Sequence, residues 1–150
     1  MTNPDLKDEI EIVEEADRVR GQYLGYVNQI ERTIEEKISY CFFKTKNEDF
    51  IRTILDDQAV GFYALRAIFI NCLKLKGLND KATFFEGRLQ EFGKLRNKII
   101  HGHILTQWDD GVYKKTILRR GGNEGDFFEQ SDKFTKFFSE IVQELILLEL

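Results

Sequence analysis

The chain has 150 residues, of which 42% are hydrophobic and 32% are charged, with one proline and a formal net charge of −4. This composition is typical of a single packed domain and excludes a disordered or collagen-like chain. The negative charge also disfavours a protein that coats nucleic acid indiscriminately, because that activity needs a broadly basic surface.

The charges are unevenly distributed along the sequence. Residues 1–20 carry seven acidic and three basic side chains, whereas residues 94–120 carry seven basic and two acidic ones. If the fold gathers the second stretch on one face, that face can hold a polyanion locally. The alternative is that both stretches are ordinary solvated faces.

The first predicted element is a charged, peripheral helix over residues 5–20, after which Gly21 and Gly25 loosen the chain. A second helix is expected to end near Phe43, because apolar residues before it recur at spacings of three and four. These apolar residues are Leu24, Val27, Ile30, Ile34, Ile38 and Cys41.

Three further helices are predicted. Asn47 or Asp49 can cap a short helix through Leu55, and residues 59–75 are apolar on most sides, as in a central helix. Gly77 is placed to end that helix. The next helix is expected to run to Gly102, with an apolar stripe of Phe85, Leu89, Phe92, Leu95 and Ile99.

Residues 103–125 change period and place the turn dipeptide Asp110–Gly111 between two runs rich in β-branched and aromatic residues. This pattern predicts a small β-hairpin or a long ordered loop. Gly121–Gly122 and Gly125 are expected to form a flexible joint before a final helix that begins at about Ser131.

Together these elements predict an all-α fold. We expect an antiparallel four-helix bundle in one domain over residues 21–150, with an extra acidic helix at residues 1–20. The hairpin or ordered loop, at about residues 103–125, would be an insertion before the last helix.

Cys41 and Cys72 lie in apolar, helix-like runs without a CxxC pair or other ligands at metal spacing, which indicates buried free thiols in a reducing compartment. Residues 1–15 lack the features of a signal peptide, and no segment approaches the ~18 consecutive apolar residues of a membrane span. We therefore expect a cytoplasmic protein that does not act at a membrane.

The sequence gives little support for metal or cofactor chemistry. His101 and His103 are the two histidines, and with Asp109 and Asp110 as the nearest carboxylates they fall short of the usual ligand sets. Patterns such as GxSxG, the P-loop, GxGxxG and HExxH do not occur. We predict no metal and no cofactor.

One segment does point to a function. Residues 95–102 read Leu-Arg-Asn-Lys-Ile-Ile-His-Gly near the end of an amphipathic helix. This resembles the signature of the HEPN superfamily, an arginine followed by a polar residue, often asparagine, and then by a histidine after four to six intervening positions. Arg96, Asn97 and His101 match that signature, and the predicted layout of residues 21–150 is similar as well.

The resemblance implies an RNA-binding protein or a metal-independent endoribonuclease that forms a homodimer, as in toxin–antitoxin systems or antiviral defence. In such a site His101 would be the acid/base and Arg96 would stabilise the pentavalent phosphate. Asn97 would orient His101 or the phosphate. Lys98 and His103 are candidate substrate contacts.

Helix geometry restricts how these residues can meet. At about 100° per residue, Asn97 and His101 share a face, whereas Arg96 and His101 diverge by roughly 140°. Three arrangements would bring the last two together: an arginine side chain that wraps around the helix, a local break before Gly102, or a second copy of the helix. The resemblance implies the third, because HEPN ribonucleases build a composite cleft at a two-fold axis.

Other interpretations stay open. A histidine followed by glycine is an ordinary helix end, and Arg96 and Asn97 can be plain surface residues. The chain would then be a non-catalytic HEPN-like dimeric regulator or interaction module, or a binding partner of a nucleotidyltransferase. The resemblance also implies a cognate antitoxin as a possible partner. Trp108 either packs against the bundle or stacks on a base.

Overall fold

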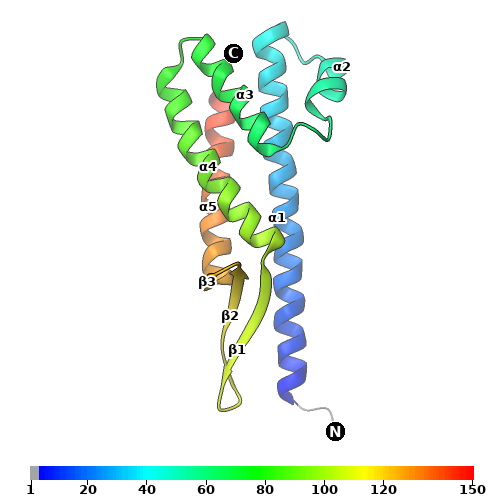
Figure 1. Cartoon of the computed structure of the whole chain (residues 1–150), viewed down its shortest axis with the longest axis vertical. Helices are drawn as coiled ribbons and strands as arrows, with labels where there is room; N and C mark the ends of the chain where they lie inside the picture. Colours follow the sequence, from blue (N-terminus) through cyan, green and yellow to red (C-terminus); the bar gives the residue numbers. More distant parts are fainter. Residues whose placement is uncertain (1–3) are drawn as a thin grey trace. The chain divides into compact units, whose positions relative to one another are not determined.

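The computed structural model describes residues 4–150. The helices in that range are α1 (Pro4–Phe43), α2 (Glu48–Phe50), the π-helix η1 (Ile51–Leu55), α3 (Phe62–Leu75), α4 (Asn79–His101) and α5 (Phe127–Leu147), and the strands are β1 (His103–Asp109), β2 (Val112–Arg120) and β3 (Asn123–Asp126) (Figure 1). The chain forms two compact units. The first unit contains the described residues up to Tyr26 and residues 94–136, and the second contains residues 27–93 and 137–150.

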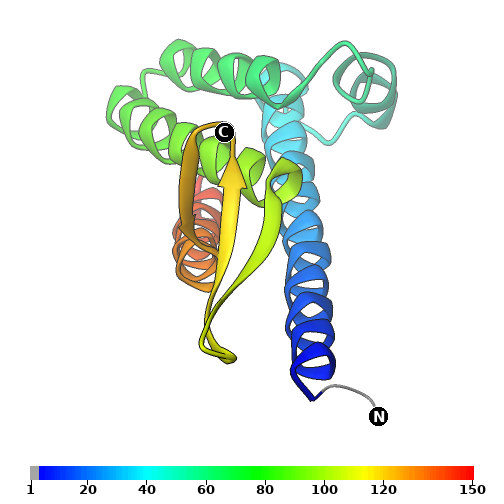
Figure 2. The same ribbon diagram turned by 60° about the horizontal axis from the view of Figure 1, so that its bottom comes forward.

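The chain is mostly helical, as predicted, but it is not purely all-α, because β1, β2 and β3 form an antiparallel sheet in that order (Figure 2). The hairpin predicted within residues 103–125 is present. Asp109 pairs with Val112 across a two-residue turn. Asp110 and Gly111 have φ angles of 50° and 76°, as the mirror-image turn of a tight hairpin requires.

The prediction of a flexible joint at Gly121–Gly122 and Gly125 is wrong. Arg120 pairs with Asn123 across Gly121 and Gly122, so these glycines form a second tight turn into β3. Helix α5 therefore begins at Phe127, earlier than the predicted Ser131. Its first turn is capped by Asp126, whose Oδ1 accepts a hydrogen bond from the Glu129 amide at 2.8 Å.

Helix α1 continues through Gly21 and Gly25, where the sequence predicted a loosened chain. A glycine costs an exposed helix about 1 kcal/mol relative to alanine, which is too little to break a helix that packs on both sides of it. Such packing is present, since Ala16 and Tyr23 are buried before Gly25 and Val27 and Ile30 are buried after it. Leu24, predicted to face inward, is 43% exposed.

The second unit has a core made by apolar stripes of its helices. The buried residues are Val27, Ile30, Ile34, Ile38, Ile51, Leu55, Leu65, Phe69, Ile70, Cys72, Leu73, Ala82, Phe85, Leu89, Phe92, Ile141, Leu145 and Leu148. The rings of Phe69 and Phe85 meet edge to face at 5.2 Å, which joins α3 to α4. The predicted stripe of α4 is confirmed.

Two helix ends of the second unit are set by residues next to them, as the sequence predicts. Asn47 caps α2 as predicted, since its Oδ1 accepts a hydrogen bond from the Phe50 amide at 2.9 Å. Gly77 has a φ of 73° and ends α3, while the Leu78 amide donates to the Leu73 carbonyl at 2.9 Å. This is the glycine-dependent helix ending that the sequence predicts.

The first unit is held together around Tyr23 of α1. Its ring lies 4.9 Å from that of Phe134 on α5, edge to face. Its hydroxyl donates to the Ser131 carbonyl at 3.0 Å. With Leu95, Ile99, Leu118 and Phe127 also buried, the end of α4 and strand β2 share this core. No helix of the described residues is long and apolar enough to cross a membrane.

Candidate functional site

The signature residues lie in the last two turns of α4, within the first unit. Leu95 and Ile99 anchor these turns because both are buried. The helix is regular to its end: it includes His101, and the Gly102 amide donates to the Lys98 carbonyl at 2.8 Å. The local break considered as a way to bring Arg96 and His101 together is therefore absent.

The structure joins Arg96 to Asn97 by a hydrogen bond between their side chains. Asn97, His101 and His103 are exposed, and Arg96 and Lys98 are half-buried. Arg96 Nη1 donates a hydrogen bond to Asn97 Oδ1 at 3.1 Å, so the amide orients the guanidinium. On a regular helix the backbones of Arg96 and His101 still diverge by roughly 140°. A wrapping arginine side chain or a second copy of α4 is left to bring them together.

Two arginines from outside the signature also reach the end of α4. Arg20 Nη2, on α1, donates to the Gly102 carbonyl at 2.7 Å. Arg120 Nη1, at the end of β2, donates to the Asn97 carbonyl. The Gly102 carbonyl lies beyond the helix end, and the Asn97 carbonyl lies in the last turns, where the helix dipole is negative, so both guanidinium groups are favourably placed. We call the group of Arg20, Arg96, Asn97, Lys98, His101 and Arg120 the α4 end.

The basic character predicted for residues 94–120 is thus partly gathered in one place. Each guanidinium has five donors, so a hydrogen bond to one carbonyl leaves capacity for another acceptor on Arg20 and Arg120. Arg119 differs, because its Nε donates to Glu124 Oε1 at 2.6 Å and its charge is matched locally. Sequence reasoning missed Arg20, which lies in the acidic stretch and reaches α4 through tertiary structure alone.

Gly102 lets the chain turn directly from α4 into the sheet. A Cβ atom at this position would lie 2.3 Å from the Lys98 carbonyl oxygen and 2.6 Å from Leu118 Cδ1. Real Cβ contacts are never that short, so any side chain here would push the helix end away from β2. The glycine therefore fixes where His101 and His103 stand relative to the strand.

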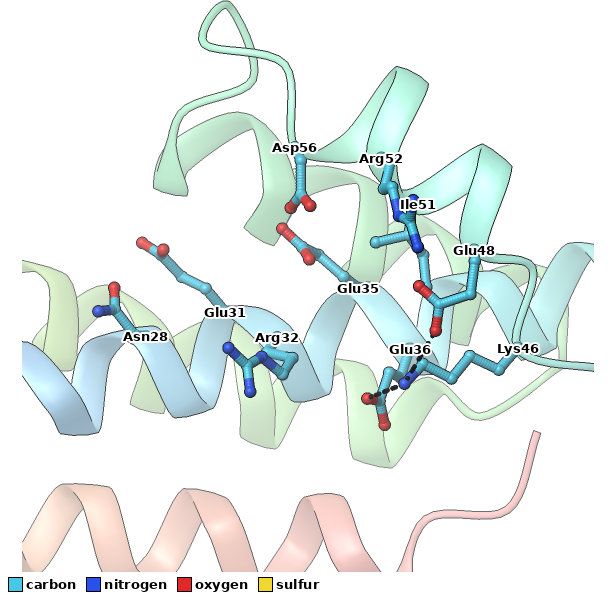
Figure 3. Close-up of a pocket in the computed structure, with 10 residues that line it drawn as sticks. All are labelled: Asn28, Glu31, Arg32, Glu35, Glu36, Lys46, Glu48, Ile51, Arg52 and Asp56. Carbon is cyan, nitrogen blue, oxygen red and sulfur yellow. Dashed lines mark ion pairs between the residues drawn. The ribbon is translucent and has the colours of Figure 1, made fainter.

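A second charged region lies in the second unit, between α1 and the α2–η1 segment. We call it the carboxylate pocket, and its lining residues are Asn28, Glu31, Arg32, Glu35, Glu36, Lys46, Glu48, Ile51, Arg52 and Asp56 (Figure 3). Lys46 Nζ bridges Glu36 at 3.0 Å and Glu48 at 3.2 Å. These ion pairs raise the pKa of Lys46. No pattern in the sequence predicted this pocket.

Two carboxyl groups face each other in the carboxylate pocket, those of Glu35 and Asp56 (Figure 3). Burial, together with a hydrogen bond to Asp56 and its charge, raises the pKa of Glu35 to about 8. Glu35 therefore holds a proton at neutral pH. A protonated carboxyl donates a hydrogen bond to its neighbour, so this pair ties α1 to the end of η1.

The remaining reactive groups are poor candidates for a site. Cys41 and Cys72 are free thiols, and burial raises the pKa of Cys72 to about 12, so it is not a nucleophile at neutral pH. Among residues 4–150, no three histidine, cysteine, aspartate or glutamate side chains are arranged to hold a metal ion.

Comparisons of the chain with models of known protein families, with curated proteins and with solved structures found no match. The choice between the α4 end and the carboxylate pocket therefore depends on chemistry. At the α4 end, His101 is exposed, and Arg20, Arg96 and Arg120 bind to Gly102 and Asn97 of the same helix end. An imidazole and guanidinium groups are the side chains that reactions of a phosphodiester use. In the carboxylate pocket the acids are matched by Lys46 and by a shared proton.

Proposed function

We propose that the chain is a HEPN-type RNA-binding protein that cleaves RNA without a metal ion, and that it acts as a homodimer. The observation that carries this proposal is the α4 end, where the exposed His101 stands beside Gly102, on whose carbonyl Arg20 is placed. Arg96 and Arg120 converge on Asn97 in the preceding turn. Arg96, Asn97 and His101 resemble the HEPN signature in type and spacing.

The chemistry follows from the side chains. His101 would withdraw the proton of a ribose 2′-hydroxyl and return a proton to the leaving 5′-oxygen, since an imidazole can both accept and donate a proton. The 2′-oxygen then attacks the adjacent phosphorus, the bond to the 5′-oxygen breaks, and a 2′,3′-cyclic phosphate forms. Arg96 would stabilise the charge of the pentavalent phosphate, held in place by its hydrogen bond to Asn97.

A homodimer supplies what one copy of α4 lacks. Because α4 is regular through His101, the two key side chains of one copy leave the helix in different directions. Two copies related by a two-fold axis can place Arg96 of one beside His101 of the other. Lys98, half-buried, and His103, exposed at the start of β1, would contact the RNA backbone.

Several finer expectations belong to this proposal. They are an antiparallel four-helix bundle forming one domain over residues 21–150, a cytoplasmic location, a role in toxin–antitoxin or antiviral defence, and control by a cognate antitoxin.

A second function is favoured by one specific observation. Arg20 and Arg120 both donate to carbonyls at the end of α4, which is also what residues do when they simply cap a helix. The chain would then be a non-catalytic HEPN-like dimeric regulator or interaction module, or a partner of a nucleotidyltransferase.

Cleavage of labelled RNA in EDTA distinguishes the two functions. We expect the wild-type protein to cut and His101→Ala to lose about 10²–10⁴-fold in rate, the usual contribution of general acid–base catalysis. His103→Ala is the matched control, since it removes the other exposed histidine, and we expect it to weaken binding and to leave the maximal rate within a few-fold. Equal cleavage by the wild type and His101→Ala would contradict the catalytic assignment. No cleavage by the wild type would favour the regulator.

A further inference from the structure

A third region of the molecule has no part in the proposed ribonuclease site. It is a cavity of about 640 Å³ in the first unit, between the N-terminal part of α1 and the β1–β2 hairpin. Its lining residues are Asp8, Glu11, Ile12, Glu15, Trp108, Gly111, Val112, Tyr113 and Phe128. We call it the aromatic cavity. Its volume lies within the range of pockets that bind ligands larger than a single side chain.

Hydrogen bonds fix the aromatic walls of this cavity. The rings of Trp108 and Tyr113 meet edge to face, with centroids 5.7 Å apart and planes at 70°. Trp108 Nε1 donates to Thr106 Oγ1 at 3.1 Å, and that hydroxyl donates to Glu9 Oε1 of α1 at 2.9 Å. The Tyr113 hydroxyl is bonded to Thr116 at 2.7 Å. Since the polar atoms of both rings are engaged, the rings offer mainly their π-faces and edges to a ligand.

The opposite wall is acidic. Asp8, Glu11 and Glu15 follow one another on α1 at intervals of three and four, so they lie on the face that lines the cavity. Arg18 pairs with Glu15 at 2.6 Å and partly neutralises it. None of the nine described lining residues is basic. A phosphate group would be repelled here, which disfavours the stacking of Trp108 on an RNA base.

The combination of aromatic faces and carboxylates is what binds organic cations. A guanidinium or ammonium group gains from the quadrupole of an aromatic ring and from nearby carboxylates, while its aliphatic stem packs on apolar surface. Ile12, Val112 and Phe128 provide that apolar surface, and Val112 is 58% exposed. A neutral ligand would gain nothing from the carboxylates, and an acidic ligand would be repelled by them.

We propose that the aromatic cavity binds a basic peptide segment of a partner protein, with an arginine or lysine side chain against Trp108 and Tyr113 and an adjacent apolar residue on Val112. The size of the cavity requires more than one residue of the partner. The acidic wall selects its charge. The site is independent of the α4 end, so it stands whether or not the chain cleaves RNA.

Trp108 makes the proposal testable without a label, because it is the one tryptophan of the chain. We would titrate the full chain with an amidated hexapeptide of four arginines and two leucines and record tryptophan fluorescence. A saturable change is expected. The same hexapeptide with glutamates in place of arginines should give none, and neither should a hexamer of single-stranded RNA.

Two double variants separate a specific site from general attraction to an acidic helix. Asp8→Asn with Glu11→Gln removes two carboxylates of the cavity, and we expect about tenfold weaker peptide binding. Glu14→Gln with Asp17→Asn removes the same charge from exposed residues of α1 outside the cavity, and binding should change less than twofold. Circular dichroism checks that both variants keep their helix content.

Three results would overturn the proposal. One is equal weakening of peptide binding by the two double variants. Another is a fluorescence change with the RNA or the glutamate peptide as large as that with the arginine peptide. The third is the absence of any change with the arginine peptide at millimolar concentration.

Discussion

The α4 end and the carboxylate pocket are both rich in charge, yet the chain treats their charges differently. In the carboxylate pocket, Lys46 bridges two glutamates and Glu35 keeps a proton beside Asp56. At the α4 end, Arg20 and Arg120 contact backbone carbonyls, which carry partial rather than full negative charge. The charges of the pocket are therefore paired within the fold, whereas these two arginines contact backbone dipoles, and under the proposed function they would also meet an external anion.

Exposure supports the same distinction. His101 and Asn97 are exposed on one face of α4, so a large polyanion can approach them. Glu35 is only partly accessible, and its raised pKa reflects that burial. Charged residues that are satisfied within the fold stabilise it or tune its pH dependence, whereas charged residues near an exposed acid/base are the ones to test for function.

The largest effect that would separate the two regions is on catalysis. Arg96→Ala should lower the rate of RNA cleavage in EDTA about 10²–10³-fold, because it removes the group that would stabilise the transition state. Arg52→Ala, which removes an exposed arginine from the carboxylate pocket, should leave the rate unchanged. Arg96→Lys, which keeps the charge, should recover part of the rate. If Arg96→Ala and Arg52→Ala lowered the cleavage rate equally, the rate would depend on the total positive charge and not on the position of Arg96.

The next effect is on stability. Gly102→Ala would place a Cβ against the Lys98 carbonyl and Leu118, and we expect it to lower the free energy of unfolding by about 2–3 kcal/mol. Gly87→Ala, on the same helix with open space around it, should raise it by up to about 1 kcal/mol. Urea unfolding measures both. If Gly102→Ala had the same free energy of unfolding as the wild type, the junction of α4 and β1 would have room for a side chain.

The smallest effect concerns pH. The pKa of Glu35 is raised in the folded protein to about 8 from an ordinary value of 4.5, so the folded state binds more protons than the unfolded state between those values. Stability should therefore fall as the pH rises from about 4.5 to 8. Because Glu35 is partly exposed and solvent screens its charge, the expected loss in the free energy of unfolding is on the order of 1 kcal/mol.

Glu35→Gln isolates this contribution. The variant should lose that part of the pH dependence and be the more stable protein at pH 8, as measured by urea unfolding at pH 5 and pH 8. Glu86→Gln, on an exposed part of α4, is the control and should follow the wild type. The same pH dependence in Glu35→Gln and the wild type would mean that Glu35 is ionised at neutral pH.

Short-range rules account for what the sequence predicted correctly. The stripe of α4, the Asn47 cap, the ending at Gly77 and the Asp110–Gly111 turn each depend on residues within a few positions of one another. The predictions failed where packing or pairing outweighed a local signal. Helix α1 passes Gly25 because it is buried on both sides, and Gly121–Gly122 form a turn because Asn123 pairs with Arg120.

The sequence predicted the signature residues of the candidate site, but it did not predict the residues that tertiary structure brings to them. Arg96, Asn97 and His101 could be found by their spacing on one helix. Arg20 comes from 82 positions before the carbonyl that it contacts, and nothing in its own neighbourhood marks it. The pairing of Glu35 with Asp56 is likewise a tertiary contact, since a sequence shows that a residue is acidic but not that it will share a proton.

The most direct test of the central claim is a mixed dimer of Arg96→Ala and His101→Ala chains. If Arg96 of one copy works with His101 of the other, each variant alone is inactive. Their mixture forms heterodimers in which one complete pair survives, so the mixture should recover about a quarter of the wild-type cleavage rate in EDTA, as expected for random pairing of the subunits. A mixture as inactive as its components would contradict a site shared between two copies.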